Sequence, residues 1–167
     1  DELEYSHTIG DTTLVFAAVS NDTVTLQFLP DANGSTNIIF TATNPTIRAS
    51  VSDTMTITIL PVNDAPVLAY IGSQTTNEDT IKVITLSAID VEGDNLSYSA
   101  SSLDTNVSVI VSNDTLTLIP ATNWNGTTSI TVIVTDGSLT DSETFTLIMI
   151  GINDPPVLAV ISDITID

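Results

Sequence analysis

Residues 144–150 read TFTLIMI, and this stretch alternates between two faces with a period of two. Phe145, Leu147 and Met149 fall on one face, whereas Thr146 falls on the other. This alternation is typical of a half-buried β-strand. The stretch is rich in apolar and β-branched residues, which suit a pleated surface packed against a core. It therefore predicts a strand of an antiparallel sheet.

The same pattern recurs outward from this stretch, and no segment shows a helical period with caps. Asn113-Asp114 separates two apolar runs and predicts a tight hairpin turn. Strands are expected at about residues 66–71, 80–88, 95–100, 106–111, 115–119, 128–135 and 142–150. Seven short strands in about 90 residues, each with one inward face, predict an all-β fold, a seven-stranded Greek-key β-sandwich.

The chain contains nearly the same sequence twice. Residues 94–159 repeat residues 1–69 with small shifts. Asn21 matches Asn113 at an offset of 92, whereas Asn63 matches Asn153 at an offset of 90, so a two-residue difference falls between Thr43 and Met55. A period near 90 residues is much longer than a solenoid repeat and indicates a string of whole domains.

The repeat divides the chain into three expected segments. Residues 1–64 form a partial repeat that lacks its first two strands, residues 65–154 a complete repeat, and residues 155–167 the first strand of a third. The simplest interpretation is a window on a longer protein of end-to-end domains. The alternative is that residues 156–167 donate a strand to the open first repeat of a neighbouring chain, because an unpaired sheet edge recruits strands. That strand would fill only part of the gap.

Composition excludes several functions. The net charge is −19, and Lys82 and Arg48 are the only fixed cations. Binding to nucleic acid or to an anionic membrane surface depends on Lys and Arg, so neither is expected. No apolar run is long enough to cross a bilayer. The single histidine, His7, has no nucleophile or carboxylate arranged around it in the sequence, so we expect no enzyme activity.

Five motifs in order carry a family resemblance. They are VNDAPV at residues 62–67, NEDT at 77–80, AIDVEGDNLSYS at 88–99, PATNWNG at 120–126 and VTDGSLTDSETF at 134–145. Together they resemble the tandem cadherin-like repeats of large bacterial surface proteins, the dystroglycan-type cadherin-like and adhesin extender group. The resemblance covers the whole chain. It implies immunoglobulin/cadherin-like sandwiches arranged end to end outside the cell, with joints often stiffened by calcium.

The residues themselves also indicate calcium, which takes six to eight oxygen ligands from carboxylates, amides and carbonyls. Asp90, Glu92 and Asp94 alternate through a loop that contains a glycine. Asn63 and Asp64 lie at the joint that precedes the same repeat, so we expect these five residues to form one metal site. The competing interpretation is that Asp, Asn and Gly only build turns here.

A second metal site is expected at the far end of the complete repeat. Its candidate ligands are Glu78, Asp79, Asp136, Asn153 and Asp154. The first repeat has Asn44-Pro45 in place of Asp136 and lacks the counterpart of Glu78 and Asp79, so its own joint should bind calcium more weakly.

Two functions remain open. In the first, the repeats are spacers of an extracellular or cell-surface adhesin or filament, with neighbouring repeats of the same protein as their partners. In the second, they bind polysaccharide or other copies of the chain in a filament. Trp124 is the one tryptophan that could stack on a sugar, but its counterpart in the first repeat is Ala32. Because exposed aromatic residues are scarce, the spacer interpretation is preferred.

Overall fold

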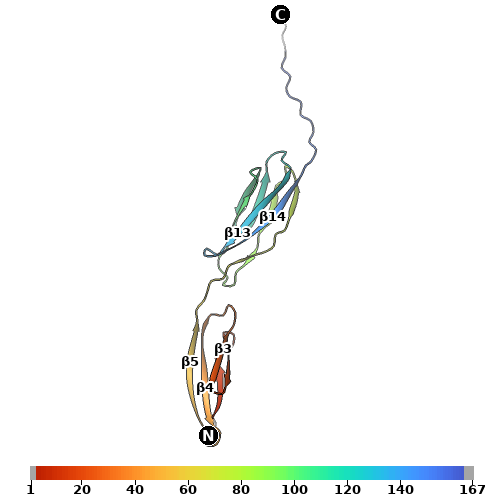
Figure 1. Cartoon of the computed structure of the whole chain (residues 1–167). Helices are drawn as coiled ribbons and strands as arrows, with labels where there is room; N and C mark the ends of the chain where they lie inside the picture. Colours follow the sequence, from red (N-terminus) through yellow and green to blue (C-terminus); the bar gives the residue numbers. More distant parts are fainter. Residues whose placement is uncertain (1–2, 164–167) are drawn as a thin grey trace. The chain divides into compact units, whose positions relative to one another are not determined.

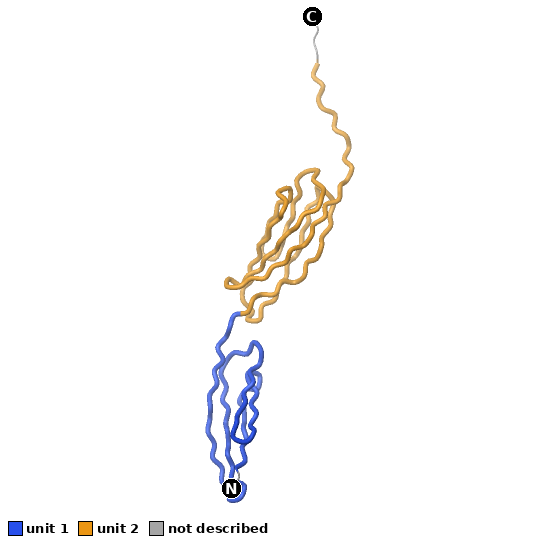
Figure 2. Tube along the Cα trace, in the orientation of Figure 1, with its two compact units in different colours: residues 1–63 blue, residues 64–167 orange. Residues whose placement is uncertain are grey.

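The structure, a computed structural model, describes residues 3–163, and every regular element in that range is a β-strand (Figure 1). The chain forms two compact units, unit 1 at residues 1–63 and unit 2 at residues 64–167 (Figure 2). Residues 164–167 of the expected third repeat lie outside the described residues.

The described part of unit 2, residues 64–163, contains nine strand segments. They are β6 (Val67–Leu68), β7 (Gln74–Asn77), β8 (Lys82–Thr85), β9 (Ala88–Ile89), β10 (Ser97–Ser102), β11 (Val107–Ser112), β12 (Thr115–Pro120), β13 (Gly126–Thr135) and β14 (Thr140–Ile150). One sheet has the order β10-β13-β14-β7 and the other has the order β11-β12-β8, while β6 pairs with β9. The all-β sandwich that the alternating pattern predicts is confirmed.

The core of unit 2 comes from the inward positions of both sheets. Leu116 and Leu118 of β12 and Ile130 of β13 are fully buried, as is Leu147 of β14. Each such side chain contributes about 1.5–3 kcal/mol when it is removed from water. Residues from the start of the unit complete the core, because Leu68 and Leu86 belong to the same buried cluster.

The strand expected at residues 66–71 is divided in the structure. Only residues 67–68 pair there, with β9, and the chain then crosses to form β7, which pairs in parallel with the end of β14. The sequence analysis missed β7 because QTTN has no apolar alternation. Its backbone hydrogen bonds to β14, rather than buried side chains, account for the strand.

Unit 1 repeats the later part of this plan. Its strands are β1 (Glu4–Ile9), β2 (Val15–Ser20), β3 (Thr23–Phe28), β4 (Gly34–Asn44) and β5 (Ala49–Ile59). The sheet β1-β4-β5 corresponds to β10-β13-β14, and the hairpin β2-β3 corresponds to β11-β12. Among the described residues of unit 1, nothing corresponds to β6, β7, β8 or β9.

The strand register locates the two-residue difference between the repeats. Asn44 pairs with Ala49 across the β4–β5 turn, which leaves residues 45–48 in the turn. In unit 2, Thr135 pairs with Thr140 and the ladder of β13 and β14 otherwise matches, with Ile38 opposite Met55 as Ile130 is opposite Phe145. The turn has four residues in both units, at 45–48 and 136–139, so the two extra residues of unit 1 add one pair, Asn44 with Ala49, to the end of the ladder and leave the facing of every strand unchanged.

Candidate metal centre

The loop after β9 is built around the carboxylate of Asp90. Its Oδ1 atom accepts the backbone N–H groups of Glu92 and Asp94, each at 3.1 Å. Gly93 has a φ of 75°, a left-handed conformation that glycine adopts without steric cost. The second oxygen of Asp90, Oδ2, is buried and has no hydrogen-bond partner.

The joint-side residue Asp64 lies close to this loop. The backbone N–H of Asp64 donates to Oε2 of Glu92 at 3.2 Å. This bond places the Glu92 carboxylate beside the first residue of unit 2. Asn63, the other joint residue in the prediction, is the last residue of unit 1. We call the region formed by Asp64 and residues 90–94 the Asp64 end of unit 2.

Asp136 lies at the Asp64 end and not with Glu78 and Asp79. It follows β13, whose last residue, Thr135, pairs with Ser97 at the start of β10. Asp136 Oδ1 accepts the N–H groups of Ser138 and Leu139 and so organises the β13–β14 turn. Because β14 runs the full length of the sheet, this turn and Glu78 are at opposite ends, and the expected grouping of Asp136 with Glu78 and Asp79 is wrong.

The opposite end of unit 2, which we call the Asp154 end, is organised by Glu78. This side chain is only 7% exposed. Its Oε2 accepts the Nδ2–H of Asn125 at 3.1 Å, and its Oε1 accepts the backbone N–H of Ile152. Glu78 thus fastens the segment that follows β14, and both of its oxygens already have donors.

At the Asp154 end, the side-chain amide of Asn123 contacts both Asp79 and Asp154. Asp79 Oδ1 accepts the backbone N–H of Asn123 at 2.9 Å. In the amide orientation that satisfies its neighbours, Asn123 Nδ2 donates to Oδ2 of Asp79 at 3.3 Å and to Oδ2 of Asp154 at 3.0 Å. Asn153 Nδ2 donates to the backbone oxygen of Asp154 at 3.3 Å.

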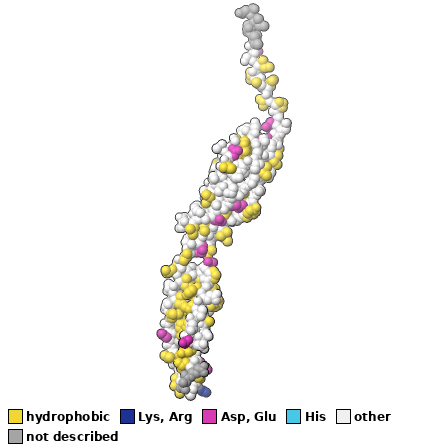
Figure 3. Space-filling view, viewed as in Figure 1, with side chains coloured by type: hydrophobic (Ala, Val, Ile, Leu, Met, Phe, Trp, Pro, Cys, Tyr) yellow, Lys and Arg dark blue, Asp and Glu magenta, His cyan; other side chains and the backbone are white. Residues whose placement is uncertain are grey.

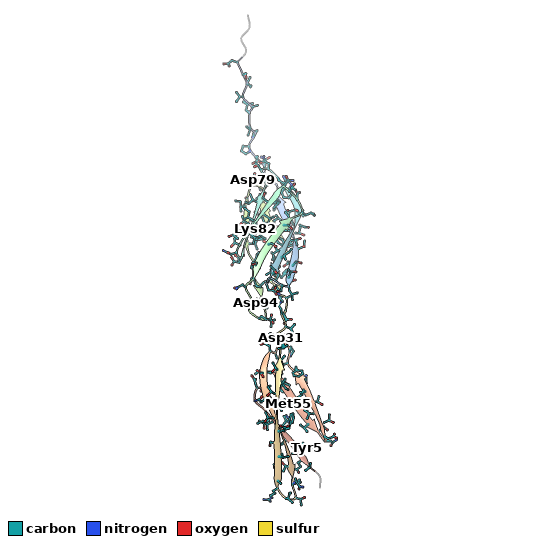
Figure 4. The ribbon with its side chains drawn as sticks, turned by 90° about the vertical axis from the view of Figure 1, so that its left-hand side faces the viewer. Tyr5, Asp31, Met55, Asp79, Lys82 and Asp94 are labelled. Carbon is teal, nitrogen blue, oxygen red and sulfur yellow. The ribbon has the colours of Figure 1, made fainter. Side chains whose placement is uncertain are left out.

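The two ends therefore differ in whether a buried carboxylate oxygen lacks a hydrogen-bond donor. Figure 4 labels Asp79 and Asp94 at the opposite ends of unit 2. Within residues 3–163, no three His, Cys, Asp or Glu side chains already stand in a metal-ligating group. At the Asp154 end, side-chain amides and backbone N–H groups occupy the carboxylates, whereas at the Asp64 end Asp90 keeps one buried oxygen without a donor.

Two acidic residues that the sequence analysis did not select have structural roles. Asp141 Oδ2 accepts the N–H of Leu68 at 2.8 Å. Glu143 accepts the N–H groups of Ile71 at 2.8 Å and Gly72 at 3.1 Å. These carboxylates fasten the first segment of unit 2 to β14. Their alternate positions on one strand face were the only signal in the sequence.

The structure also places three other residues that the sequence analysis named, Trp124, His7 and Lys82. Trp124 is partly buried against the core of unit 2, and its ring lies 3.5 Å from the position of a Cβ on Gly126. The ring of His7 lies 6.4 Å from that of Phe40. Lys82 lies on β8, an edge strand. Within residues 3–163 no helix has the length and apolar character needed to span a membrane.

The chain was compared with models of protein families. Residues 62–149, more than half of the chain, match the model of the cadherin-like domain. No curated protein matches the chain. Members of this family are non-enzymatic, and cadherin-like domains typically bind calcium and are generally extracellular.

Solved structures show the same fold. The chain is similar to human protocadherin-24 EC1-2 with a TM-score of 0.53, 14% identity, and coverage of 93% of this chain and 84% of that one. It is similar to Drosophila N-cadherin EC1-4 with a TM-score of 0.53 and 18% identity, covering 89% of this chain and 41% of that one. An endo-fucoidan hydrolase of glycoside hydrolase family 107 matches at a TM-score of 0.39 and 16% identity over 87% of this chain. The chain spans only 23% of that hydrolase, and this likeness carries no argument about activity.

Proposed function

Because the chain belongs to the cadherin-like domain family, we propose that it is an extender module of a long extracellular or cell-surface adhesin or filament, with joints stiffened by calcium. Its partners would be the neighbouring repeats of the same protein. Two units built on one strand plan support this role, because repeated modules add reach without adding chemistry. The proposal assigns the units no catalytic step.

One observation supports calcium most directly, the buried and unpartnered Oδ2 atom of Asp90. A buried carboxylate oxygen without a donor costs stability, because it has lost its water and gained nothing in return. A bound cation would supply the missing partner. Calcium fits the oxygen-rich surroundings, since Glu92, Asp94 and the carbonyl groups of the loop are ligands of the type it takes.

The hydrogen bonds of the Asp64 end would preorganise such a site. The two N–H groups on Asp90 Oδ1 hold the loop closed, and the Asp64 N–H holds Glu92 beside the joint. Asn63 and Asp64 are proposed to contribute oxygen ligands from the joint, and Asp136 from the neighbouring turn. Positive charge bound there would also offset the repulsion between these acidic residues.

The Asp154 end is the second proposed site, with Glu78, Asp79, Asn153 and Asp154 as ligands. Calcium would have to replace donors that already satisfy Glu78, Asp79 and Asp154. We therefore expect it to bind more weakly there than at the Asp64 end. If the Asp64 end binds calcium before the Asp154 end does, a calcium titration should show two steps.

The test is a thermal melt and small-angle scattering of the chain in calcium and in chelator. Binding to the folded state alone stabilises it by about 2.7 kcal/mol when free calcium is 100 times the Kd. We expect a higher Tm and a narrower range of interdomain bending in calcium. Unchanged melting and scattering would contradict the proposal.

Asp90→Asn separates calcium binding from turn formation. The amide keeps a side-chain oxygen for the loop N–H groups but removes the charge, so we expect most of the calcium-dependent rise in Tm to disappear. Asp114→Asn is the matched control. It removes the same charge, and Asp114 lies in the exposed β11–β12 turn. If both variants keep the full calcium effect, Asp90 is not a ligand.

A further inference from the structure

β11 is an edge strand whose outer side is open within the complete repeat. Its sheet has the order β11-β12-β8, and within residues 64–163 no strand pairs with its outer edge. Its counterpart in unit 1 is β2, which pairs only with β3 among the described residues. The strand plan that both units share therefore leaves this edge open. An open edge is a template for another strand.

The sequence of β11 does not protect this edge, whereas the other edges of unit 2 differ. Charged residues and short strands are common means of blocking an edge. β8 carries Lys82, β7 has only four residues, and the exposed side chains of β10 are serines. β11 has six residues, reads VSVIVS and contains no charge. Ile110 in this strand is 54% exposed, so an apolar side chain lies at the open edge.

The hydrogen bonds of β11 show which main-chain groups face outward. The N–H of Ala121 donates to the carbonyl oxygen of Asn106 at 2.7 Å, in the register that continues through β11 and β12. Bonded and non-bonded pairs alternate along an antiparallel ladder. The even-numbered residues of β11 therefore bond to β12, and the N–H and C=O groups of Val109 and Val111 point to the outer edge.

The sequence of this strand is also symmetric. Residues 108–112 read SVIVS, which is the same in both directions. A two-fold axis at Ile110 would make two antiparallel copies self-complementary, as an isologous contact requires. The residues placed opposite each other would be Ile110 and Ile110, Val109 and Val111, and Ser108 and Ser112. This symmetry favours a second copy of β11 over an unrelated strand.

The distribution of charge permits the same pairing. A net charge of −19 opposes association through acidic surfaces. On the face of unit 2 in view in Figure 3, acidic side chains are few and scattered. Asp114 follows β11 directly, and a two-fold axis at Ile110 places it opposite the uncharged Asn106 of the second copy. No two carboxylates would be directly opposite each other in this ladder.

We propose that two copies of the chain associate through β11 of unit 2, antiparallel and about a two-fold axis at Ile110. Val109 of each copy would exchange two main-chain hydrogen bonds with Val111 of the other. Ile110 would pack on its copy in the non-hydrogen-bonded position, where the Cα atoms are about 4.5 Å apart. The two three-stranded sheets would then form one six-stranded sheet. This association goes beyond the extender role and needs no calcium, because β11 contains none of the proposed ligands.

Unit 1 does not offer the same pairing. Its β2 has Ala18 at the position of Ile110, with Phe16 and Ser20 at the positions of the two serines. A two-fold axis at Ala18 would place Phe16 opposite Ser20 and leave only alanine at the centre. Unit 2 should therefore carry the association, and the product should be a closed dimer.

The first test measures mean mass against concentration, by sedimentation or light scattering, in calcium and in chelator. The wild-type chain should approach twice the mass of one chain in both conditions. Ile110→Lys should raise the Kd of the dimer about tenfold or more, because like charges would lie directly opposite each other. Val83→Lys is the matched control, because Val83 is 58% exposed on the other edge strand of this sheet and gains the same charge.

Both variants make the net charge less negative, so a loss of dimer in Ile110→Lys alone would not reflect general repulsion. A monomer at every concentration, or a dimer that Ile110→Lys leaves intact, would overturn the proposal. A dimer that chelator abolishes would also overturn it and would point to the metal sites. A dimer that persists while calcium leaves the Tm unchanged would contradict the calcium proposal alone.

The second test determines the register. The chain has no cysteine, so introduced thiols report only the new contact. Ile110→Cys should form a disulfide between copies, and Ser108→Cys should form one with Ser112→Cys when the two variants are mixed. Ser108→Cys alone should crosslink far less, because its equivalent would lie four residues away on the other strand, about 13 Å along it. Crosslinking of Ser108→Cys with itself as fast as with Ser112→Cys would overturn the two-fold axis at Ile110.

Discussion

Unit 1 and unit 2 share five strands and differ in the segment that precedes them. Both units form the long hairpin, β4–β5 or β13–β14, and the short hairpin, β2–β3 or β11–β12, with the same facing of side chains. Only unit 2 has β6 to β9, and unit 2 alone contains the large buried cluster among the described residues. The hairpins therefore form the layers, and the earlier segment closes the core between them.

This difference arises from the sequence separation between the residues that are in contact. A hairpin joins residues that are close in sequence, so its turn and its alternation are sufficient to specify it. Closure of unit 2 instead brings Leu68 to Asp141 and Ile71 to Glu143, more than 70 residues apart.

The largest expected difference comes from truncating a core position. Leu147→Ala removes a fully buried side chain of β14 and should lower the free energy of unfolding by about 2–5 kcal/mol. Its counterpart Ile57 is only half-buried, so Ile57→Ala should cost less than half as much. Urea unfolding followed by hydrogen exchange would assign each loss to its unit. Equal losses would show that unit 1 has a closed core.

The next comparison concerns the carboxylate that fastens the first segment of unit 2. Glu143→Ala leaves the N–H groups of Ile71 and Gly72 without their acceptor, and should cost about 1–3 kcal/mol. Asp53→Ala at the corresponding site should change stability by less than about 0.5 kcal/mol in the monomer. A large loss at Asp53 in dilute solution would mean that unit 1 has a partner there.

A third comparison tests a feature that the units share. Gly34 and Gly126 both begin the long hairpin with positive φ, at 132° and 150°. Substituting either one with alanine should strain the backbone by about 1–3 kcal/mol, with similar values in both units. Thermal unfolding of the two variants gives the measurement. A much smaller loss at Gly34 would show that the open unit relaxes its hairpin.

The smallest effect is expected at a turn of unit 1. The Thr13 hydroxyl donates to Asp11 Oδ1 at 2.6 Å and the Thr13 N–H donates at 2.8 Å, and these bonds lower the pKa of Asp11. A carboxyl with a folded pKa below its unfolded value adds stability above the unfolded pKa, and this stability is lost as pH falls through the folded pKa. Thr13→Val should raise the pKa of Asp11 in an NMR titration, whereas Thr13→Ser should not. Identical titration curves for Thr13→Val and the wild type would exclude the hydroxyl as a cause.

Much of the fold could be predicted because local sequence patterns specify it. The alternation around Phe145 and the turn at Asn113 are both present where they were expected. The missed strand, β7, has a polar sequence and depends on the distant edge of β14. No pattern of side chains could indicate it.

The candidate metal residues show the same limit. The loop of Asp90, Glu92 and Asp94 could be selected because its members lie close in sequence, and the first two hydrogen bonds of that loop are local. Asp136 was grouped with the wrong end because the direction of β13 and β14 decides where their turn lies. Asp141, Glu143 and Asn123 were missed because their partners are remote in the sequence.

The sequence by itself determined the hairpin strands, their inward faces and the repeat, because period-two alternation and turn residues act over a few neighbouring positions. Only the tertiary structure decided which edges are covered, which carboxylates have donors and which oxygen of Asp90 remains buried without one. These properties depend on the separation of atoms in space, and a linear order of residues does not contain that separation until the strands have been placed.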